Sequence, residues 1–353
     1  MVERQYAADA APAVDVQRCG VVMAPTGSAL DLEGVLNPGV ARDRSGSLLL
    51  YPRIVAAGNV SRIGVVRAVD TDKGPVLGPP TIVLAPEAEY ERRTTAGGYG
   101  CEDPRVTFIA QLDVYVMAYT AFGPRGPRIA VAVSDDGYAW RRLGLVQYAD
   151  DALNALPNKD AAFFPEPVLA PDGVPSLALY HRPMLHESVS GQAPIGFIRS
   201  LPPEKREVTC IAYVPLGPVL RDLTELTFAA HSVVVLPIGE TWGLLKNGAG
   251  TPPVRTAAGW LSFFHGVDAI DRREGASLYY RAGIVIHDVE RPDRIVYRSA
   301  EPFLEPEAIE ERHGTVDDVV FPTGVDPRGD DTFDVYYGAA DAKISRVRVR
   351  VTP

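Results

Sequence analysis

The sequence predicts an all-β protein of the β-propeller type, and three observations lead to this prediction. Short β-rich runs fill the chain, among them "SLLLYPRIV", "DVYVMAYTAF" and "SRVRVRV", and turn residues separate them at short intervals. Long amphipathic helical patterns are absent. A strand–strand–turn unit also recurs, as in "RIGVVRAVDTDKG", "RIAVAVSDDGYAW" and "RAGIVIHDVERPD", which is typical of propeller blades. Because the period is irregular, a pair of β-sandwiches remains the alternative.

The length of 353 residues allows one large domain or two average ones. No stretch rich in Gly, Ser or charge divides the chain. We therefore expect a single propeller domain over residues 15–353, preceded by an N-terminal arm over residues 1–14.

Composition excludes several classes of protein. The net charge of −10 and the lack of a basic run argue against nucleic-acid binding. No apolar run approaches the roughly 18 residues of a membrane span, and the N-terminus lacks an apolar segment after a basic start. Cys19, Cys101 and Cys210 lie far apart, without the spacing of a disulfide framework or a zinc site. We expect a cytoplasmic protein with no metal and no membrane partner.

Residues 100–106, "GCEDPRV", form the first of four segments that place polar groups beside apolar runs. Pro104 fixes its own φ and is expected to hold Asp103 in an extended conformation. Arg105 can neutralise one acid and leave the other free. One interpretation is a solvated turn with an ion pair. The other is a general acid in a partly buried pocket.

Three further segments carry candidate ligand groups. In "PNKDAAFFPEP", Lys159 could hold an anion or mark the exposed start of a strand. In "KNGAGTPPVRTAAGWLSFFHGV", His265 ends an apolar strand, where a hydrogen-bonded core histidine is the alternative to a catalyst. The "GAG" there lacks the strand–helix context of a dinucleotide site. In "GTVDDVVFPTG", Asp318 could bind sugar hydroxyls or a metal, or form a turn, although no metal-binding spacing accompanies it.

In their order along the chain, these segments resemble glycoside hydrolase family 130, the mannoside phosphorylases and β-mannosidases. The matching pieces are "NPGVAR", "GCEDPRV", "NKDAAFFPEP" with "YHRP", "KNGAGTPPVRT" with "GWLSFFHGV", "YYRAGIVIHD", "DDVVFPTG" and "VYYGAAD". They run from about Asn37 to Asp341 and cover nearly the whole chain after the arm. The resemblance implies a five-bladed β-propeller with the site in its axial cavity.

The resemblance also implies an inverting enzyme in which Asp103 is the general acid and relays its proton through a mannose hydroxyl. The residues implied to bind the mannosyl unit are Asn37, Arg53, Arg105 and Asp318. The residues implied to bind phosphate are Lys159, His265 and Tyr280. Arg142 is a further candidate, because it lies close to a turn where the sequence departs from the family. An inverting phosphorylase needs one carboxylic acid, because phosphate is already a nucleophile and a cationic pocket replaces the second carboxylate. No cofactor is implied, and inorganic phosphate is the co-substrate.

The main prediction is a phosphorylase that converts a β-mannoside and phosphate to α-mannose 1-phosphate. One departure favours a β-mannosidase that uses water. Tyr138 and Ala139 stand where an Arg-Asn pair is frequent in the phosphorylases, and Glu166 or Glu225 would then be the base. A non-catalytic sugar-binding propeller is the third alternative. The linkage (β-1,2 or β-1,4), the acceptor sugar and the formation of a homo-oligomer are left open.

Overall fold

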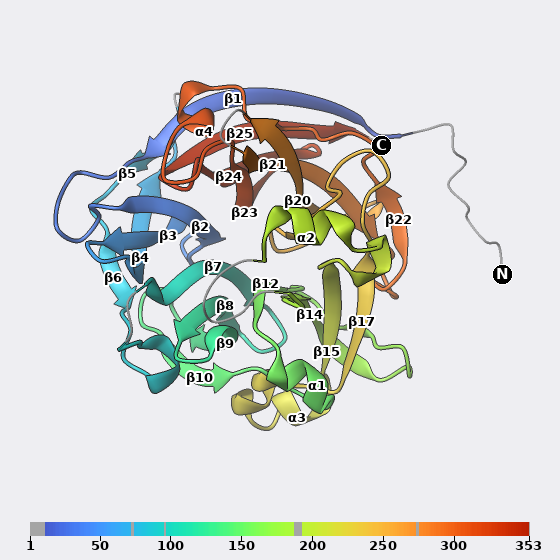
Figure 1. The fold of residues 1–353 in the computed structure, drawn as a ribbon. Coiled ribbons are helices and arrows are strands. Elements are labelled where there is room, and N and C mark those ends of the chain that lie inside the picture. The colour runs from blue at the N-terminus through green and yellow to red at the C-terminus, as the bar shows by residue number, and fades with distance from the viewer. Residues whose placement is uncertain (1–10, 72–73, 95–96, 187–192, 273–274, 353) are drawn as a thin grey trace.

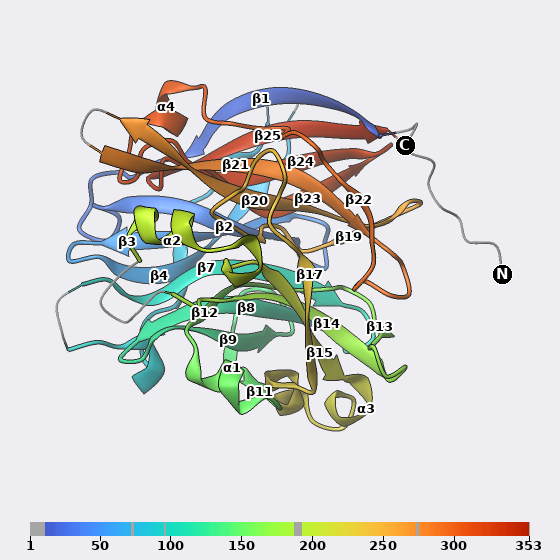
Figure 2. The ribbon, with the colours of Figure 1, turned by 45° about the vertical axis from the view of Figure 1, so that its right-hand side comes forward.

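The strands form five blades around a central axis in the computed structural model, which describes residues 11–71, 74–94, 97–186, 193–272 and 275–352 (Figure 1). The five-bladed β-propeller that the resemblance implied is confirmed. The first strand of each blade lies nearest the axis, and the strands that follow it lie progressively further out (Figures 1 and 2).

From the axis outward, blade 1 contains β2 (Gly34–Arg42), β3 (Leu48–Ala56) and β4 (Val60–Val69), with β5 (Val76–Leu77) and β6 (Thr81–Leu84) on its edge. In the same direction, blade 2 contains β7 (Tyr99–Ile109), β8 (Val114–Gly123), β9 (Gly126–Ser134) and β10 (Arg141–Leu145). Blade 3 contains β12 (Asn158–Phe163), β14 (Pro175–Pro183), β15 (Thr209–Pro215) and β17 (His231–Leu236), with β13 (Val168–Leu169) beside β14.

Blade 4 contains β18 (Lys246–Ala249), β20 (Gly259–Arg272), β21 (Gly275–His287) and β22 (Ile295–Arg298), with β19 (Val254–Thr256) beside β20. Blade 5 contains β23 (Val320–Gly329), β24 (Thr332–Ala339), β25 (Lys343–Thr352) and β1 (Ala13–Met23). The parallel pair β11 (Gln147–Tyr148) and β16 (Phe228–Ala229) lies outside the blades.

Helices occur only as short pieces in the connections between the described strands. They are the 3-10 turns η1 (Glu89–Glu91), η2 (Pro203–Lys205) and η3 (Leu223–Thr227), and the helices α1 (Asp151–Ala155), α2 (Ile195–Ser200), α3 (Leu216–Val219) and α4 (Ile309–Arg312). Among the described residues, no helix is both long enough and apolar enough to cross a membrane.

The two ends of the chain close the ring. Strand β1 pairs with β25 along its whole length and so supplies the outer strand of the last blade. The expected arm over residues 1–14 is two residues too long, because Ala13 and Val14 pair with Thr352 and Val351. Val14 also packs against the core of blades 4 and 5. Residues 1–10 lie outside the described part of the chain, and an arm over them stays a proposal.

Removal of residues 1–23 should destabilise the whole ring, because it leaves the backbone N–H and C=O groups on one edge of β25 unpaired and deletes one strand of blade 5. We expect aggregation on expression, or a fall in Tm of about 10 °C. Removal of residues 1–10 is the control, since it leaves every pair of β1 in place. Differential scanning calorimetry of the two truncations measures the effect. Equal Tm values for both would show that β1 does not close the ring.

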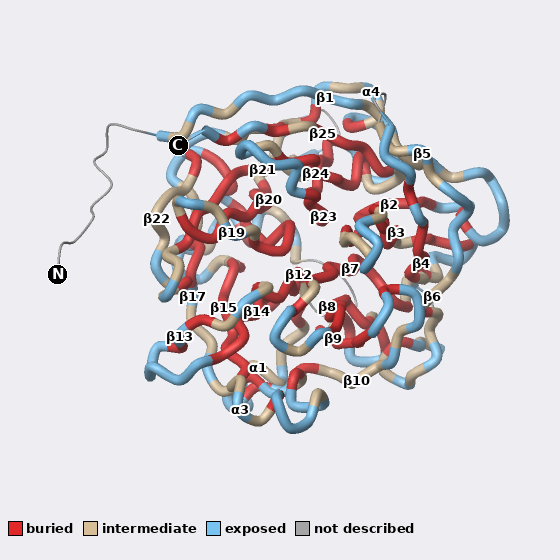
Figure 3. The backbone as a smooth tube through the Cα atoms, turned by 180° about the vertical axis from the view of Figure 1, so that it is seen from behind, coloured by how far each residue is buried: buried red, intermediate tan, exposed pale blue. Residues whose placement is uncertain are grey.

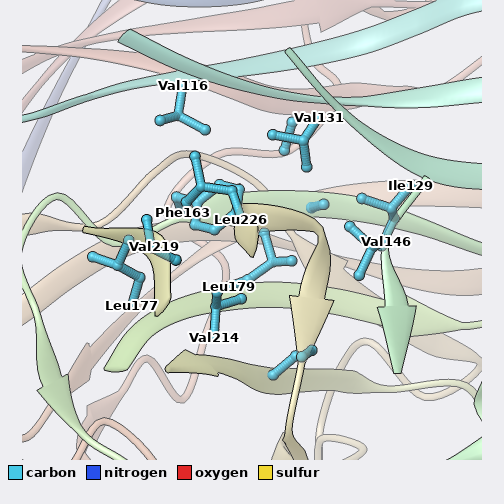
Figure 4. Close-up of a cluster of buried hydrophobic side chains, with 14 of the residues drawn as sticks. Val116, Ile129, Val131, Val146, Phe163, Leu177, Leu179, Val214, Val219 and Leu226 are labelled. Atoms are coloured by element: carbon cyan, nitrogen blue, oxygen red, sulfur yellow. The ribbon is translucent and has the colours of Figure 1, made fainter. Parts of the chain in front are cut away.

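Buried residues are frequent on the strands around the axis (Figure 3), and clusters of buried apolar side chains join neighbouring blades. One cluster joins blades 2 and 3, where Val116, Ile129 and Val131 meet Phe163 and Leu179 (Figure 4). Burying a side chain of this kind stabilises the fold by about 1.5–3 kcal/mol. The blades are therefore fixed relative to one another, and polar side chains on different inner strands keep a fixed geometry.

A bulge recurs on the innermost strands. The pairing register shifts at Asn37 in β2, at Asp103 in β7 and at Asp160 in β12, and these residues have φ values of 45°, 47° and 59°. The expectation that Pro104 holds Asp103 extended is therefore wrong. Asn and Asp tolerate left-handed backbone better than other residues with a Cβ, and a bulge redirects the side chain of the bulged residue. Asp318, just before β23, has a φ of 60°.

Candidate active site

Asp103 lies at the centre of a polar cluster at one end of the propeller axis, and only 2% of its surface is exposed. Its Oδ1 accepts hydrogen bonds from Asn37 Nδ2 at 2.8 Å and from an Arg53 guanidinium nitrogen at 3.1 Å. Lys159 Nζ lies 3.9 Å from its Oδ2. Burial alone would raise the pKa of Asp103, but the charges of Arg53, Lys159 and Arg105 outweigh burial and lower the pKa.

Two more carboxyl groups adjoin Asp103. Glu102 Oε1 accepts from the second terminal nitrogen of Arg53 at 2.9 Å, so one guanidinium binds two neighbouring acids. Asp341 follows β24 and has a left-handed φ of 52°. Burial raises the pKa of Glu102 and of Asp341, and each is raised further by the negative charge of Asp103. The environment thus pushes the pKa of Asp103 one way and those of its two neighbours the other.

A second buried network surrounds Asp160, the residue after Lys159. Asp160 Oδ2 accepts from Arg182 Nε at 2.7 Å, and Arg182 also donates to Glu207 at 2.7 Å. His265 Nε2 lies 3.7 Å from the same Asp160 oxygen. A Cβ on Gly248 would lie 2.3 Å from Asp160 Oδ2 and 2.4 Å from the His265 ring, so only glycine allows this contact between blades 3 and 4.

His265 is neutral at ordinary pH. Burial lowers its pKa to about 3, even though the nearby Asp160 carboxylate acts in the opposite direction. Its ring stacks near the Tyr280 ring, with 6.0 Å between the ring centroids. The backbone N–H of Tyr280 donates to the Asp318 carbonyl at 3.0 Å, and the Asp318 carboxylate pairs with Arg272. Tyr280 and Asp318 are thereby brought to the same end of the axis.

Arg105 ties backbone segments of two blades together through its guanidinium. The residue is 1% exposed, and its nitrogens donate to the carbonyls of Asp103 (3.0 Å), Gly250 (3.0 Å) and Ala249 (3.2 Å). These bonds cross from blade 2 to blade 4. Each of its three guanidinium nitrogens thus donates to a backbone carbonyl, and its predicted contact with the mannosyl unit stays a proposal.

Arg142 lies away from the site, on the outermost strand of blade 2. Its Nε donates to the buried Glu91 at 2.8 Å, and Tyr119 donates to the same carboxylate at 2.6 Å. The prediction that Arg142 binds phosphate is wrong, because the ion pair with Glu91 holds its side chain on the outside of the blade. Glu311 is a second buried carboxylate that accepts a hydrogen bond from a tyrosine, in this case from Tyr337 at 2.6 Å.

The two acids considered as a base for hydrolysis also lie away from Asp103. Glu166 is exposed, with its carboxylate 3.7 Å from a terminal nitrogen of the half-exposed Arg255. Glu225 is exposed in η3, which packs beside β10 and β15. Neither can activate water next to Asp103, so this prediction is wrong for both.

The turn that carries Tyr138 and Ala139 lies at the opposite end of blade 2 from Asp103. Strands alternate in direction, so the β9–β10 turn lies beside the end of β7, whereas Asp103 is near the start of β7. Tyr138 donates to Asp43 at 3.0 Å, and Asp43 lines a cavity of about 690 Å³ at that far end. The departure at Tyr138 and Ala139 therefore has no bearing on the site.

Four charged members of the site were not predicted from the sequence. They are Asp160, Arg182, Glu207 and Asp341. Three of them stand inside the family-like motifs "NKDA", "YHRP" and "GAAD", and Glu207 precedes β15 without a recognisable pattern. Among the described residues, no cluster of three or more histidine, cysteine, aspartate or glutamate side chains could hold a metal ion.

Mild acid should destabilise the protein because three buried histidines are held neutral. Burial lowers the pKa of His181 and His265 to about 3 and that of His287 to about 4. The unfolded chain takes up protons below about pH 6.5 and the folded chain does not, so stability falls as pH drops. Between pH 7 and pH 5.5 the three together should cost about 4 kcal/mol. Urea unfolding at both pH values measures the free energy of unfolding. The variant His313→Gln, at an exposed position, is the control and should show the same dependence of this free energy on pH as the wild type. A flat stability across this range would contradict the prediction.

Comparison with known proteins agrees with the geometry. The family model described as beta-1,4-mannooligosaccharide phosphorylase, glycoside hydrolase family 130, matches residues 33–190 and 236–351. The chain is 32% identical to the 1,2-beta-oligomannan phosphorylase of Thermoanaerobacter sp. (strain X514), over 81% of this chain and 77% of that protein. It is 29% identical to the beta-1,4-mannooligosaccharide phosphorylase of Ruminococcus albus, over 76% of this chain and 68% of that one.

The fold has solved relatives as well. The structure of the beta-1,2-mannobiose phosphorylase from Listeria innocua, in complex with beta-1,2-mannobiose, superposes with a TM-score of 0.69 at 22% identity, over 95% of this chain and 96% of that chain. The match of the family model over most of the chain, with the ordered motifs around Asp103, shows that this protein belongs to glycoside hydrolase family 130.

Proposed function

We propose that the protein catalyses inverting phosphorolysis of β-mannosides and releases α-mannose 1-phosphate. The observation that carries the proposal is the arrangement around Asp103, a buried carboxyl group whose Oδ2 lies 3.9 Å from a lysine nitrogen. A positive group beside the acid suits an anionic nucleophile, because phosphate attacks without a general base. The named phosphorylases among the relatives support the same chemistry.

In this proposal the sugar and the phosphate contact different parts of the site. Asp103 supplies the proton for the departing oxygen, and Asn37 and Arg53 orient Asp103 while they contact the mannosyl unit together with Asp318. The residues proposed to hold phosphate are Lys159, His265 and Tyr280. Since His265 is neutral, it contributes an N–H hydrogen bond, and Lys159 contributes the positive charge.

Hydrolysis is the less favoured alternative. An inverting hydrolase needs a second carboxylate roughly 6.5–9.5 Å from the acid, on the opposite face of the sugar. Glu102 shares one guanidinium with Asp103 and so lies on the acid's own side. Glu166 and Glu225 are exposed and lie elsewhere. The named candidates therefore do not supply a base for water.

The test is incubation with β-1,2-mannobiose and β-1,4-mannobiose, with and without inorganic phosphate. We expect mannose 1-phosphate with α configuration, by proton NMR, and turnover only when phosphate is present. Mannose release at the same rate without phosphate, and no mannose 1-phosphate, would establish the hydrolase instead. Binding of mannobiose with no turnover under either condition would establish a sugar-binding propeller.

The proposed reaction also bears on the co-substrate and on the location of the protein, and the linkage and the oligomeric state are open to separate tests. Phosphate is the co-substrate, and the chemistry requires no metal or organic cofactor. A cytoplasmic location is proposed because a phosphorylated sugar is of use inside the cell. Comparing turnover of the two mannobioses decides the linkage. Light scattering at several protein concentrations tests the proposed homo-oligomer.

A further inference from the structure

A cavity of about 690 Å³ lies at the end of the ring away from Asp103. Every blade contributes to its wall, through an inner strand or through the residues that follow that strand. One wall residue from each blade, in the order of blades 1 to 5, is Val40, Val106, Pro165, Pro252 and Val325. The volume is within the range of roughly 300–1,000 Å³ that small-molecule sites have.

The wall of this cavity is mostly apolar. It consists largely of valines, prolines and Phe108, and the prolines have no backbone N–H to donate. The hydroxyl groups of Thr107 and Tyr115 each donate to a backbone carbonyl at 3.0 Å. A sugar would lose the hydrogen bonds of its hydroxyl groups to water here and gain few in return. The cavity therefore suits a molecule with an apolar body.

Most charged side chains on the wall already have strong partners. Arg42 makes a bidentate pair with Asp326, at 2.8 and 2.6 Å. Arg44 donates to the Asp113 carboxylate at 2.8 Å, and its two other nitrogens donate to backbone carbonyls. Asp43 accepts hydrogen bonds from two serines and a tyrosine. A ligand could reach these groups only by breaking existing hydrogen bonds.

Arg255 lines the same cavity and is held differently. Its guanidinium lies over the Trp260 ring, 5.1 Å from the ring centroid. Among the described residues it makes one ion pair, with Glu166, and the two atoms lie 3.7 Å apart, beyond hydrogen-bond distance. The Arg255 and Glu166 side chains are 46% and 54% exposed, so this pair contributes little to stability. The Trp260 ring thus orients a positive charge that another anion can take over.

We propose that this cavity binds an amphipathic monoanion, whose aromatic or alkyl body lies against the apolar wall and whose carboxylate or sulfonate pairs with Arg255. The anionic group takes the place of Glu166, and the apolar body leaves water as it enters the cavity. Both ends of such a ligand then have a partner on the wall.

The buried Arg105 lies between this cavity and the catalytic site. On β7, Asp103 belongs to the catalytic site and Val106 lines the cavity. Arg105, between them in the chain, donates to the carbonyls of Ala249 and Gly250 in blade 4. A ligand in the cavity should therefore leave the binding of mannobiose unchanged. The inference does not depend on the proposed function.

Fluorescence titration with anilinonaphthalene sulfonate, an amphipathic anion, tests the proposal. N-phenyl-naphthylamine has the same rings without the sulfonate and is the uncharged comparison. Arg255→Met should weaken binding of the sulfonate about 10-fold and of the uncharged probe less than about 2-fold, because only the sulfonate pairs with the guanidinium. Glu166→Gln should tighten binding of the sulfonate about 2-fold, because it removes the competing carboxylate. Arg141→Met, at an exposed position outside the cavity wall, is the control and should match the wild type.

Calorimetry should give one sulfonate probe per chain, and saturating mannobiose should not displace it. Equal affinity of this probe for the wild type, Arg255→Met and Glu166→Gln would show that it binds elsewhere and would overturn the site. No saturable binding to the folded wild type, or displacement by mannobiose, would overturn it as well. An equal loss of both probes in Arg255→Met would refute the charge contact. None of these results bears on phosphorolysis, which the product analysis decides.

Discussion

Replacing Asp103 with asparagine should lower kcat/KM for phosphorolysis by about 10³-fold or more, the largest effect expected of any single substitution. Asparagine keeps the left-handed backbone that this bulge requires and can still accept from Asn37, so the site should keep its shape. What it lacks is a proton to give to the leaving oxygen. Steady-state release of mannose 1-phosphate from mannobiose measures the loss.

Asp135→Asn is the matched control, because Asp135 is exposed in the β9–β10 turn and should keep wild-type kinetics. A thermal melt of Asp103→Asn should show a folded protein. Retention of more than about a tenth of wild-type kcat/KM in Asp103→Asn would be too much for the loss of a general acid. The catalytic assignment of Asp103 would then be withdrawn.

Among single substitutions, the largest expected effect on stability belongs to Arg105→Met. The substitution removes three donors from the buried carbonyls of Asp103, Ala249 and Gly250 and leaves Asp160 without one of its cations. Breaking a buried charge pair from one side costs about 3–5 kcal/mol. For a chain of 353 residues that corresponds to a fall in Tm of about 5 °C.

Arg67→Met provides the comparison for Arg105→Met. Arg67 is 60% exposed, and its ion pair with Asp43 spans 4.0 Å, so its loss should cost less than about 1 kcal/mol. Calorimetry of the two variants compares the buried and the exposed arginine. If Arg105→Met melts like the wild type yet loses mannobiose binding, the guanidinium contacts the sugar after all, and its role as a tie between blades 2 and 4 is refuted.

Much of this protein can be predicted from local sequence. Strand-rich runs and frequent turns predict the all-β class, because strand pairing and turn chemistry depend on neighbouring residues. The ordered motifs place Asn37, Asp103 and Lys159 at one site, and the structure brings these three into contact. These three residues lie at or beside the bulges of the inner strands. The position of each residue along its strand therefore largely decides where its side chain lies.

The tertiary structure alone decided which charges face one another. Arg105 reaches carbonyls 144 and 145 residues away, and Arg142 is held by an acid 51 residues before it. Such pairs depend on how the blades pack, and a short sequence motif does not predict that packing. Strand direction likewise places Tyr138 at the far end from Asp103. Residue type and spacing determined the chemistry that the chain can offer, whereas the ring determined which groups are free to perform it, because burial and long-range pairing set each pKa and each hydrogen bond.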